Sequence, residues 1–134
     1  MFYKFKIKVT KLNEKTDTER EVTEEYLTDD ILYGQVELKA LQIYPDRDAD
    51  CITISRSNIK EIVNDELPDG QWYDATVSEL FVLESGREKK MKYHLLVSAT
   101  SVDDATERVN RHLRQGFGDM SLEAVKLTRI VSII

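Results

Sequence analysis

Two runs of alternating lysines, each beside an aromatic residue, are the part of this sequence whose residue types and spacing best suit binding chemistry. Lysines occupy every second position after Phe2, and the pattern recurs in the second half of the chain, which opens at Trp72. Aromatic rings stack on bases and lysines bind phosphates, so such a face on an open sheet is typical of single-stranded nucleic-acid binding. The predicted binding residues are Phe2, Lys4, Lys6, Lys8, Trp72, Arg87, Lys90 and Lys92.

The same residues also fit an ordinary sheet surface. Glu21 and Glu25 are predicted to face the first lysines across a strand pair, which is a common stabilising arrangement. Asp74 is predicted to face the second stripe, which consists of Lys90, Lys92 and His94. The chain has 25 acidic and 19 basic residues, a net charge of −6, which is unlike the basic field of a typical nucleic-acid protein. Phe2 and Trp72 could instead anchor a dimer or a partner protein.

Catalytic motifs are absent from the sequence. The two histidines, His94 and His112, stand in no known catalytic spacing, and there is no phosphate loop or dinucleotide fingerprint. The single cysteine, Cys51, permits neither an internal disulfide nor a cysteine-based zinc site and is predicted to be a core residue. We therefore expect a protein that is not an enzyme and needs no cofactor or metal.

Two loops resemble ligand sites only in part. Residues 46–50 alternate aspartates like the start of a calcium loop, but Cys51 stands where glycine is needed and Ser57 where a bidentate glutamate is needed. This segment is predicted to be an acidic surface loop. Residues 116–119 place two glycines near a helix end, which does not define a phosphate site.

An internal repeat is the clearest feature of the sequence. Residues 2–3 and 72–73 match at an offset of 70, and residues 26–27 and 95–96 match at an offset of 69. Because apolar positions coincide in the same order through both halves, we infer a tandem duplication with copies at about 1–64 and 71–134.

Each copy is predicted to form a strand, a second strand, a helix and a third strand. Apolar and polar residues alternate through the first strands, and short polar turns predict that both first pairs are antiparallel hairpins. Ser101 supplies a helix N-cap and Gly116 a stop for the second helix. The remaining predicted elements are strands at about 22–28, 51–55, 91–98 and 122–130 and a first helix at about 30–43.

The polar linker at residues 64–71 is short, and a copy of about 60 residues would be marginal alone. We therefore expect residues 1–134 to form a single α+β domain with pseudo-twofold symmetry. It would contain one mostly antiparallel six-stranded sheet with both helices on one side. The N-terminus lacks a secretion-signal pattern and no apolar stretch reaches the ~20 residues that span a bilayer, so a cytoplasmic protein without a membrane partner is expected.

Three short motifs carry a resemblance to a known family. They are the opening Phe2-Tyr3-Lys4, the second strand Val22-Thr23-Glu24-Glu25-Tyr26-Leu27, and Trp72-Tyr73 after the acidic linker. The whole chain resembles a domain family of unknown function found in Bacteroidetes and their phages, crAss-like phages included. The resemblance implies provenance and architecture, and the phage occurrence implies a replication or DNA-associated role.

The function favoured by the sequence is a non-enzymatic binding module for protein interaction or assembly, such as a homodimer or a phage accessory protein. The acidic charge balance suits this better than nucleic-acid binding. The alternative is a single-stranded nucleic-acid-binding protein that uses the outward sheet face. A further alternative is capture of a small nucleotide or metabolite between the copies.

Overall fold

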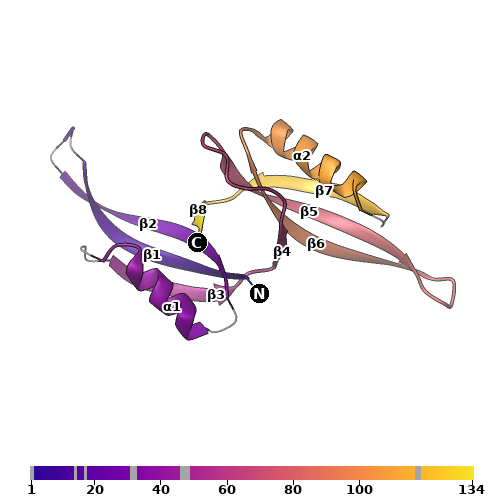
Figure 1. Ribbon diagram of the computed structural model, residues 1–134, viewed down its shortest axis with the longest axis horizontal. Coiled ribbons are helices and arrows are strands. Elements are labelled where there is room, and N and C mark those ends of the chain that lie inside the picture. Colours follow the sequence, from indigo (N-terminus) through magenta and orange to yellow (C-terminus); the bar gives the residue numbers. More distant parts are fainter. Residues whose placement is uncertain (1, 14, 17, 31–32, 46–48, 117–118) are drawn as a thin grey trace. The chain divides into compact units, whose positions relative to one another are not determined.

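The computed structural model describes residues 2–13, 15–16, 18–30, 33–45, 49–116 and 119–134 (Figure 1). These residues form two helices and eight strands, and the strands make two sheets of four. The first half contains β1 (Phe2–Asn13), β2 (Thr18–Asp29), α1 (Tyr33–Gln42), β3 (Ala49–Arg56) and β4 (Ile59–Ile62). The second half contains β5 (Gln71–Val82), β6 (Glu88–Ala99), α2 (Val102–Arg114), β7 (Met120–Leu127) and β8 (Ile130–Ile133). The α+β class is confirmed, and the single six-stranded sheet is wrong.

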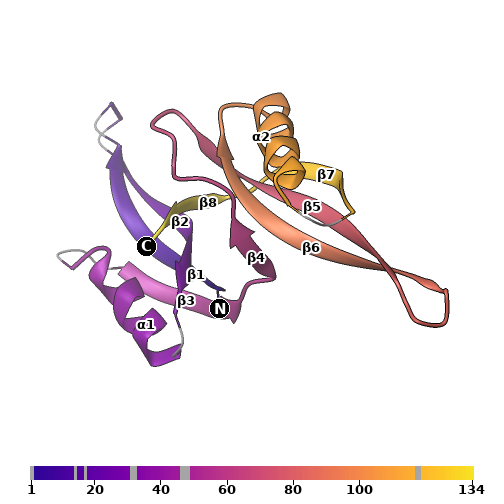
Figure 2. The ribbon, with the colours of Figure 1, turned by 45° about the vertical axis from the view of Figure 1, so that its right-hand side comes forward.

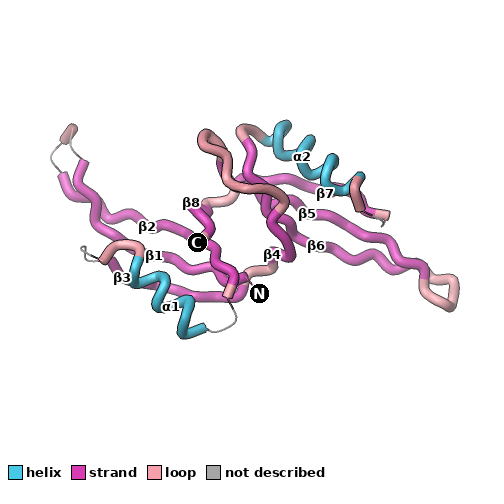
Figure 3. Tube along the Cα trace, in the orientation of Figure 1, coloured by secondary structure: helices cyan, strands magenta, loops and turns pink. Residues whose placement is uncertain are grey.

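The two halves share one order of elements. The strands of both halves are 12, 12, 8 and 4 residues long in the same sequence, with a helix after the second strand (Figure 3). Both hairpins are antiparallel as predicted. The irregularity between Lys6 and Ile7 in β1 recurs between Thr76 and Val77 in β5, which are the matching positions at the offset of 70. A shared bulge is a backbone detail that hydrophobic pattern alone does not impose, so it supports the duplication.

The fourth strand of each half joins the sheet of the other half. One sheet has the order β3-β1-β2-β8 and the other β4-β6-β5-β7. β8 pairs in parallel with β2, and β4 pairs in parallel with β6. The compact units are therefore Met1–Ser57 with Arg129–Ile134, called unit 1, and Asn58–Thr128, called unit 2.

This exchange explains the error in the predicted sheet. The segments at 59–62 and 130–133 lie at or beyond the ends of the predicted third strands, 51–55 and 122–130. Each is a separate strand, with backbone bonds that continue its ladder from Val63 to Leu96 at 2.8 Å and from Ile134 to Leu27 at 2.9 Å. Apolar pattern predicts that a segment is buried, but it does not say which of two similar sheet edges the segment joins.

The segment at 64–71, predicted to be a linker, is anchored inside unit 2. The Asn64 side chain donates to the carbonyl of Ser98 and accepts from its N–H, both at 2.8 Å. The Leu67 N–H donates to Ser98 Oγ at 3.0 Å, and Gly70 packs so closely that a Cβ would lie 2.7 Å from that oxygen. The boundaries of the compact units thus fall near 57 and 128, each directly before an exchanged strand.

Each helix covers one face of the sheet in its own unit (Figure 2). In unit 1, Val36 and Ala40 of α1 pack with inward side chains such as Phe5, Ile7 and Tyr26. In unit 2, the inward side chains of α2 are Ala105, Val109 and Leu113, and they meet Tyr73, Ala75, Val77, Leu95 and Val97. The predicted alternation of buried strand residues is confirmed here. Phe81 and Leu83 continue the same alternation of apolar residues but are 37% and 45% exposed. The β5–β6 hairpin extends past α2 (Figure 1).

The ends of α2 follow the predicted signals. The Ser101 side chain accepts a bond from the Asp104 N–H at 3.0 Å, which is the N-cap geometry. Gln115 caps the C-terminus and Gly116 follows directly. For α1, the observed Tyr33–Gln42 lies within the predicted range of about 30–43 and ends one residue earlier, within the usual uncertainty of helix termini, and residues 31–32 lie outside the described residues.

Candidate functional site

The lysine stripe of unit 1 consists of Lys4, Lys6 and Lys8. Lys6 and Lys8 form ion pairs with glutamates on the neighbouring strand. Lys6 Nζ lies 3.5 Å from Glu25 Oε1, and Lys8 Nζ lies 3.1 Å from Glu21 Oε2. The predicted cross-strand pairs are therefore confirmed. Phe2 and Lys4, at the start of the stripe, are half-buried.

The lysine stripe of unit 2 has a partner that sequence reasoning missed. Lys90 and Lys92 both reach Glu123 on β7, Lys92 at 3.3 Å, whereas Asp74 pairs with His94 at 2.9 Å. Asp74 thus meets the predicted stripe at His94, whereas Lys90 and Lys92 pair with Glu123 instead. Glu123 is the extra residue of the β5–β7 bulge, a feature that re-aims a side chain. Bonds from Lys90, then from Lys92 and Ser78, hold the pKa of Glu123 below its ordinary value.

The aromatic and turn residues of the predicted binding set differ in solvent exposure. Trp72 is only 3% exposed, which corrects its expected place on an open face, since stacking on a base requires an accessible ring. Arg87 is exposed in the hairpin turn, where Gly86 has a φ of 82° as the turn signal predicted. The side chain of Cys51, although its backbone lies in β3, and the loop at 46–48 fall outside the described residues.

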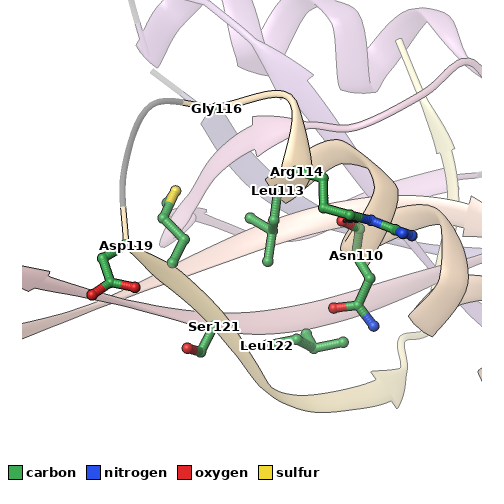
Figure 4. A pocket seen from close by; sticks show the side chains of 8 residues that line it. Asn110, Leu113, Arg114, Gly116, Asp119, Ser121 and Leu122 are labelled. Atoms are coloured by element: carbon green, nitrogen blue, oxygen red, sulfur yellow. Dashed lines mark hydrogen bonds between the residues drawn. The ribbon is translucent and has the colours of Figure 1, made fainter.

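Two hollows flank the C-terminal end of α2 in unit 2. Figure 4 shows the one beside β7, which is lined by Asn110 and Arg114 from α2 and by Asp119, Ser121 and Leu122 among others. Its volume is about 600 Å³. The second hollow, about 460 Å³, lies against β4, β5 and β6, and we call it the β4 hollow. Its lining residues are Lys60, Glu61, Glu79, Tyr93, Leu95, His112, Leu113, Gly116 and Met120.

Charged groups gather around the single tyrosine of the β4 hollow. Lys60 Nζ lies 3.7 Å from the centroid of the Tyr93 ring, and His112 Nε2 lies 3.0 Å from Glu61 Oε1. Partial desolvation, then the charge and hydrogen bonding of Glu79, raise the pKa of the Tyr93 hydroxyl above its ordinary value. No sequence signal indicates this group, because β4 comes from the other half of the chain and its pairing with β6 was not predictable.

A compact cluster of the same residue types lies in unit 1. Glu24, 8% exposed, accepts a bond from the Tyr44 hydroxyl and one from Lys11 Nζ at 3.3 Å. The Lys11 ammonium lies 5.7 Å from the centroid of the Tyr44 ring. Its bonds to Tyr44 and Glu24 raise the pKa of Lys11, and burial raises that of the neighbouring Tyr26. This arrangement shows that a lysine ammonium fits between a tyrosine ring and a carboxylate in this fold.

The exposed side of α1 carries an apolar stripe beside polar residues such as Gln35 and Glu37. Leu38 is 59% exposed and Leu41 55%, and Gly34 completes a stripe with spacings of four and three residues. The outward residues of α2 are charged and paired along the helix, for example Arg111 with Glu107 at 2.9 Å. Both helices cover equivalent sheets, so the fold itself does not require the exposed leucines.

These features define an α+β protein with two exchanged four-stranded units and no described group of three or more histidine, cysteine or acidic side chains that could hold a metal ion. The chain belongs to the family described as Domain of unknown function (DUF4494), whose model matches residues 1–134. Neither a curated protein nor a solved structure matches the chain. In the described part of the chain, neither helix has the length and apolar character needed to cross a membrane.

Proposed function

We propose that this chain is a protein-interaction module that associates with a second copy of itself through the outward face of α1. The observation that carries the proposal is the exposed stripe of Gly34, Leu38 and Leu41 on a helix whose opposite side is already committed to the core. A protein exposes large apolar side chains in a continuous stripe where another surface covers them.

The spacing of the stripe suits a second helix as the occupant. Apolar residues four and three positions apart form the seam along which two helices pack. Gly34 has open space where a Cβ would stand, which allows close approach of a second backbone. Tyr33, 55% exposed at the end of the stripe, adds an aromatic ring of the kind enriched in interfaces.

A second copy is the simplest occupant because the stripe can pair with itself across a twofold axis. The helix has 10 residues, about 15 Å at 1.5 Å per residue, so the contact is smaller than a standard interface. We therefore expect reversible association, with a dissociation constant on the order of 10–1,000 μM. A phage accessory role, implied by the sequence resemblance, remains a prediction that such an assembly module would suit.

Sedimentation velocity over a range of protein concentrations tests the proposal. Leu38→Glu places a carboxylate on each side of the twofold contact and should weaken association at least about tenfold. Leu83→Glu makes the same change at a residue 45% exposed in the β5–β6 hairpin of unit 2 and serves as the matched control. A wild-type chain that stays monomeric at millimolar concentration, or equal effects of both substitutions, would contradict the α1 interface.

Single-stranded nucleic-acid binding has less support from the same residues. Four lysines of the predicted set are ion-paired and Trp72 is buried, so the expected stacking and phosphate contacts would have to displace existing ones. Fluorescence anisotropy with a labelled oligonucleotide at low salt tests this alternative, because phosphate contacts weaken steeply as salt is added.

A further inference from the structure

We propose that the β4 hollow is a binding site for a primary alkylammonium group, supplied by a small amine or by a lysine side chain of a peptide. In this proposal the Lys60 ammonium is a tethered occupant that the ligand replaces. The site lies entirely in unit 2 and does not depend on the proposed α1 interface.

The first argument is the position of Lys60 over Tyr93. Its ammonium is 3.7 Å from the ring centroid, well inside the distance of about 6 Å at which a cation is attracted by an aromatic face. The ring is therefore accessible to an ammonium from the side of the hollow. Lys60 itself is exposed on β4, so it can move away without breaking the core.

The second argument is the charge around the ring. Glu79 and Glu61 line the hollow together with Tyr93, and Glu61 Oε1 lies 3.0 Å from His112 Nε2. The hollow also lies at the C-terminal end of α2, where the aligned peptide dipoles leave a partial negative charge. Leu95 and Leu113 supply an apolar wall for a hydrocarbon chain. An alkylammonium matches each of these parts, with its charge at the ring and carboxylates and its chain against the leucines.

The third argument comes from unit 1. Tyr93 pairs with Val77 in the same way that Glu24 pairs with Ile7, so Glu24 occupies the matching place in the other sheet. There a tyrosine, a carboxylate and the Lys11 ammonium form a closed cluster. Unit 2 presents the same three kinds of group around a hollow of about 460 Å³, which leaves room for an outside ammonium.

The test is a titration of the ¹⁵N-labelled chain with n-butylammonium chloride, followed by amide chemical shifts at constant ionic strength. Shifts should concentrate at Glu79, Tyr93 and Gly116, with a dissociation constant in the millimolar range. Lys60→Ala removes the tethered competitor and one positive charge, so it should tighten binding on the order of tenfold. Sodium chloride that produces the same shifts, or equal affinity in Lys60→Ala and the wild type, would overturn the proposal.

Four further variants separate recognition from folding. Tyr93→Leu and Glu79→Gln should each weaken binding several-fold, whereas Tyr93→Phe should keep most of it because the ring remains. Glu107→Gln removes a carboxylate from the exposed face of α2, outside the hollow, and should leave the affinity unchanged. If Tyr93→Leu loses its folded spectrum, the comparison of Lys60→Ala with the wild type still decides, since that change lies on an exposed side chain.

The source of the ammonium is distinguished by a second ligand. A blocked tripeptide with lysine between two glycines carries the ammonium on a peptide, and its norleucine counterpart is the neutral control. Tighter binding of the lysine peptide than of n-butylammonium would support a peptide ligand, and equal binding would support a small amine. Equal binding of the norleucine peptide would overturn ammonium recognition.

Discussion

Replacing Asn64 with alanine should destabilise the fold of unit 2 far more than its half-buried surface position suggests. The Asn64 amide bonds to both the N–H and the carbonyl of Ser98, at 2.8 Å each, just beyond the end of β4. β4 and Val63 pair with β6 through backbone hydrogen bonds. The Asn64 side chain makes the next hydrogen bonds along β6, at Ser98. The Asn64 amide therefore supplies the donor and the acceptor that a neighbouring strand would otherwise supply to Ser98.

The size of the effect follows from the burial of Ser98, which has no solvent exposure. Asn64→Ala leaves two buried backbone groups without their partners, and each such group costs about 1–3 kcal/mol. Water entering the space of the lost amide recovers part of this because Asn64 is half-buried, so we expect a loss of about 2–4 kcal/mol. For a unit of this size the melting temperature should fall by roughly 10–20 °C.

Urea and thermal unfolding, followed by fluorescence of the single tryptophan, measure this loss, because Trp72 lies in unit 2. Hydrogen exchange gives the local reading, since the Ser98 amide should lose protection in the variant. Asn64→Asp should be intermediate because it keeps an acceptor for the Ser98 N–H. The control is Asn58→Ala at an exposed asparagine before β4. A loss below about 0.5 kcal/mol in Asn64→Ala, equal to that of the control, would refute the reasoning.

Three other outcomes are expected. A protease site inserted after Pro68 should give two fragments that remain associated after cleavage, because each supplies the fourth strand of the other's sheet; size-exclusion chromatography would detect their separation if the exchange were absent. A hydrogen bond from the Thr100 N–H, and then one from Arg108, lower the pKa of Asp104. The stabilisation of α2 by the Asp104 carboxylate is therefore full above the ordinary aspartate pKa. It is lost as the pH falls through the lowered pKa of the folded state. The stability difference between the wild type and Asp104→Asn, followed by circular dichroism, should therefore shrink between about pH 5 and pH 2. Gly70→Ala should destabilise by about 1–3 kcal/mol because its methyl would meet Ser98 Oγ at 2.7 Å and Leu67 Cβ at 2.9 Å, and Gly34→Ala, where the space is open, should not do so in the same urea titration.

Local structure was predictable where neighbouring residues determine it. The second helix begins after Ser101 and ends before Gly116 because its cap and stop are both local signals. The ion pairs of Lys6 and Lys8 were predictable because a hairpin with a short connection leaves few choices of register. The repeat was visible because both copies preserve their apolar positions.

Features that depend on distant strands were not predictable. The exchange of β4 and β8 involves two four-residue segments whose residue pattern does not indicate which sheet edge each one joins. Glu123 forms ion pairs with Lys90 and Lys92 across β5, and it is the extra residue of a bulge that re-aims its side chain. A bulge has no reliable sequence signal. Trp72 lies on the predicted face, but alternation of polar and apolar residues says nothing about what covers that face.

Comparison of the two copies separates what the fold requires from what function could require. At equivalent positions the sheets impose the same geometry, shown by equal strand lengths and matching bulges. A difference in chemistry at such positions therefore needs another cause. The exposed Leu38 of α1, against the charged face of α2, and the open hollow at Tyr93, against the closed cluster at Glu24, are differences of this kind. Each copy thus serves as a structural control for the other. The two proposed sites are the positions at which equivalent backbone geometry carries different side-chain chemistry.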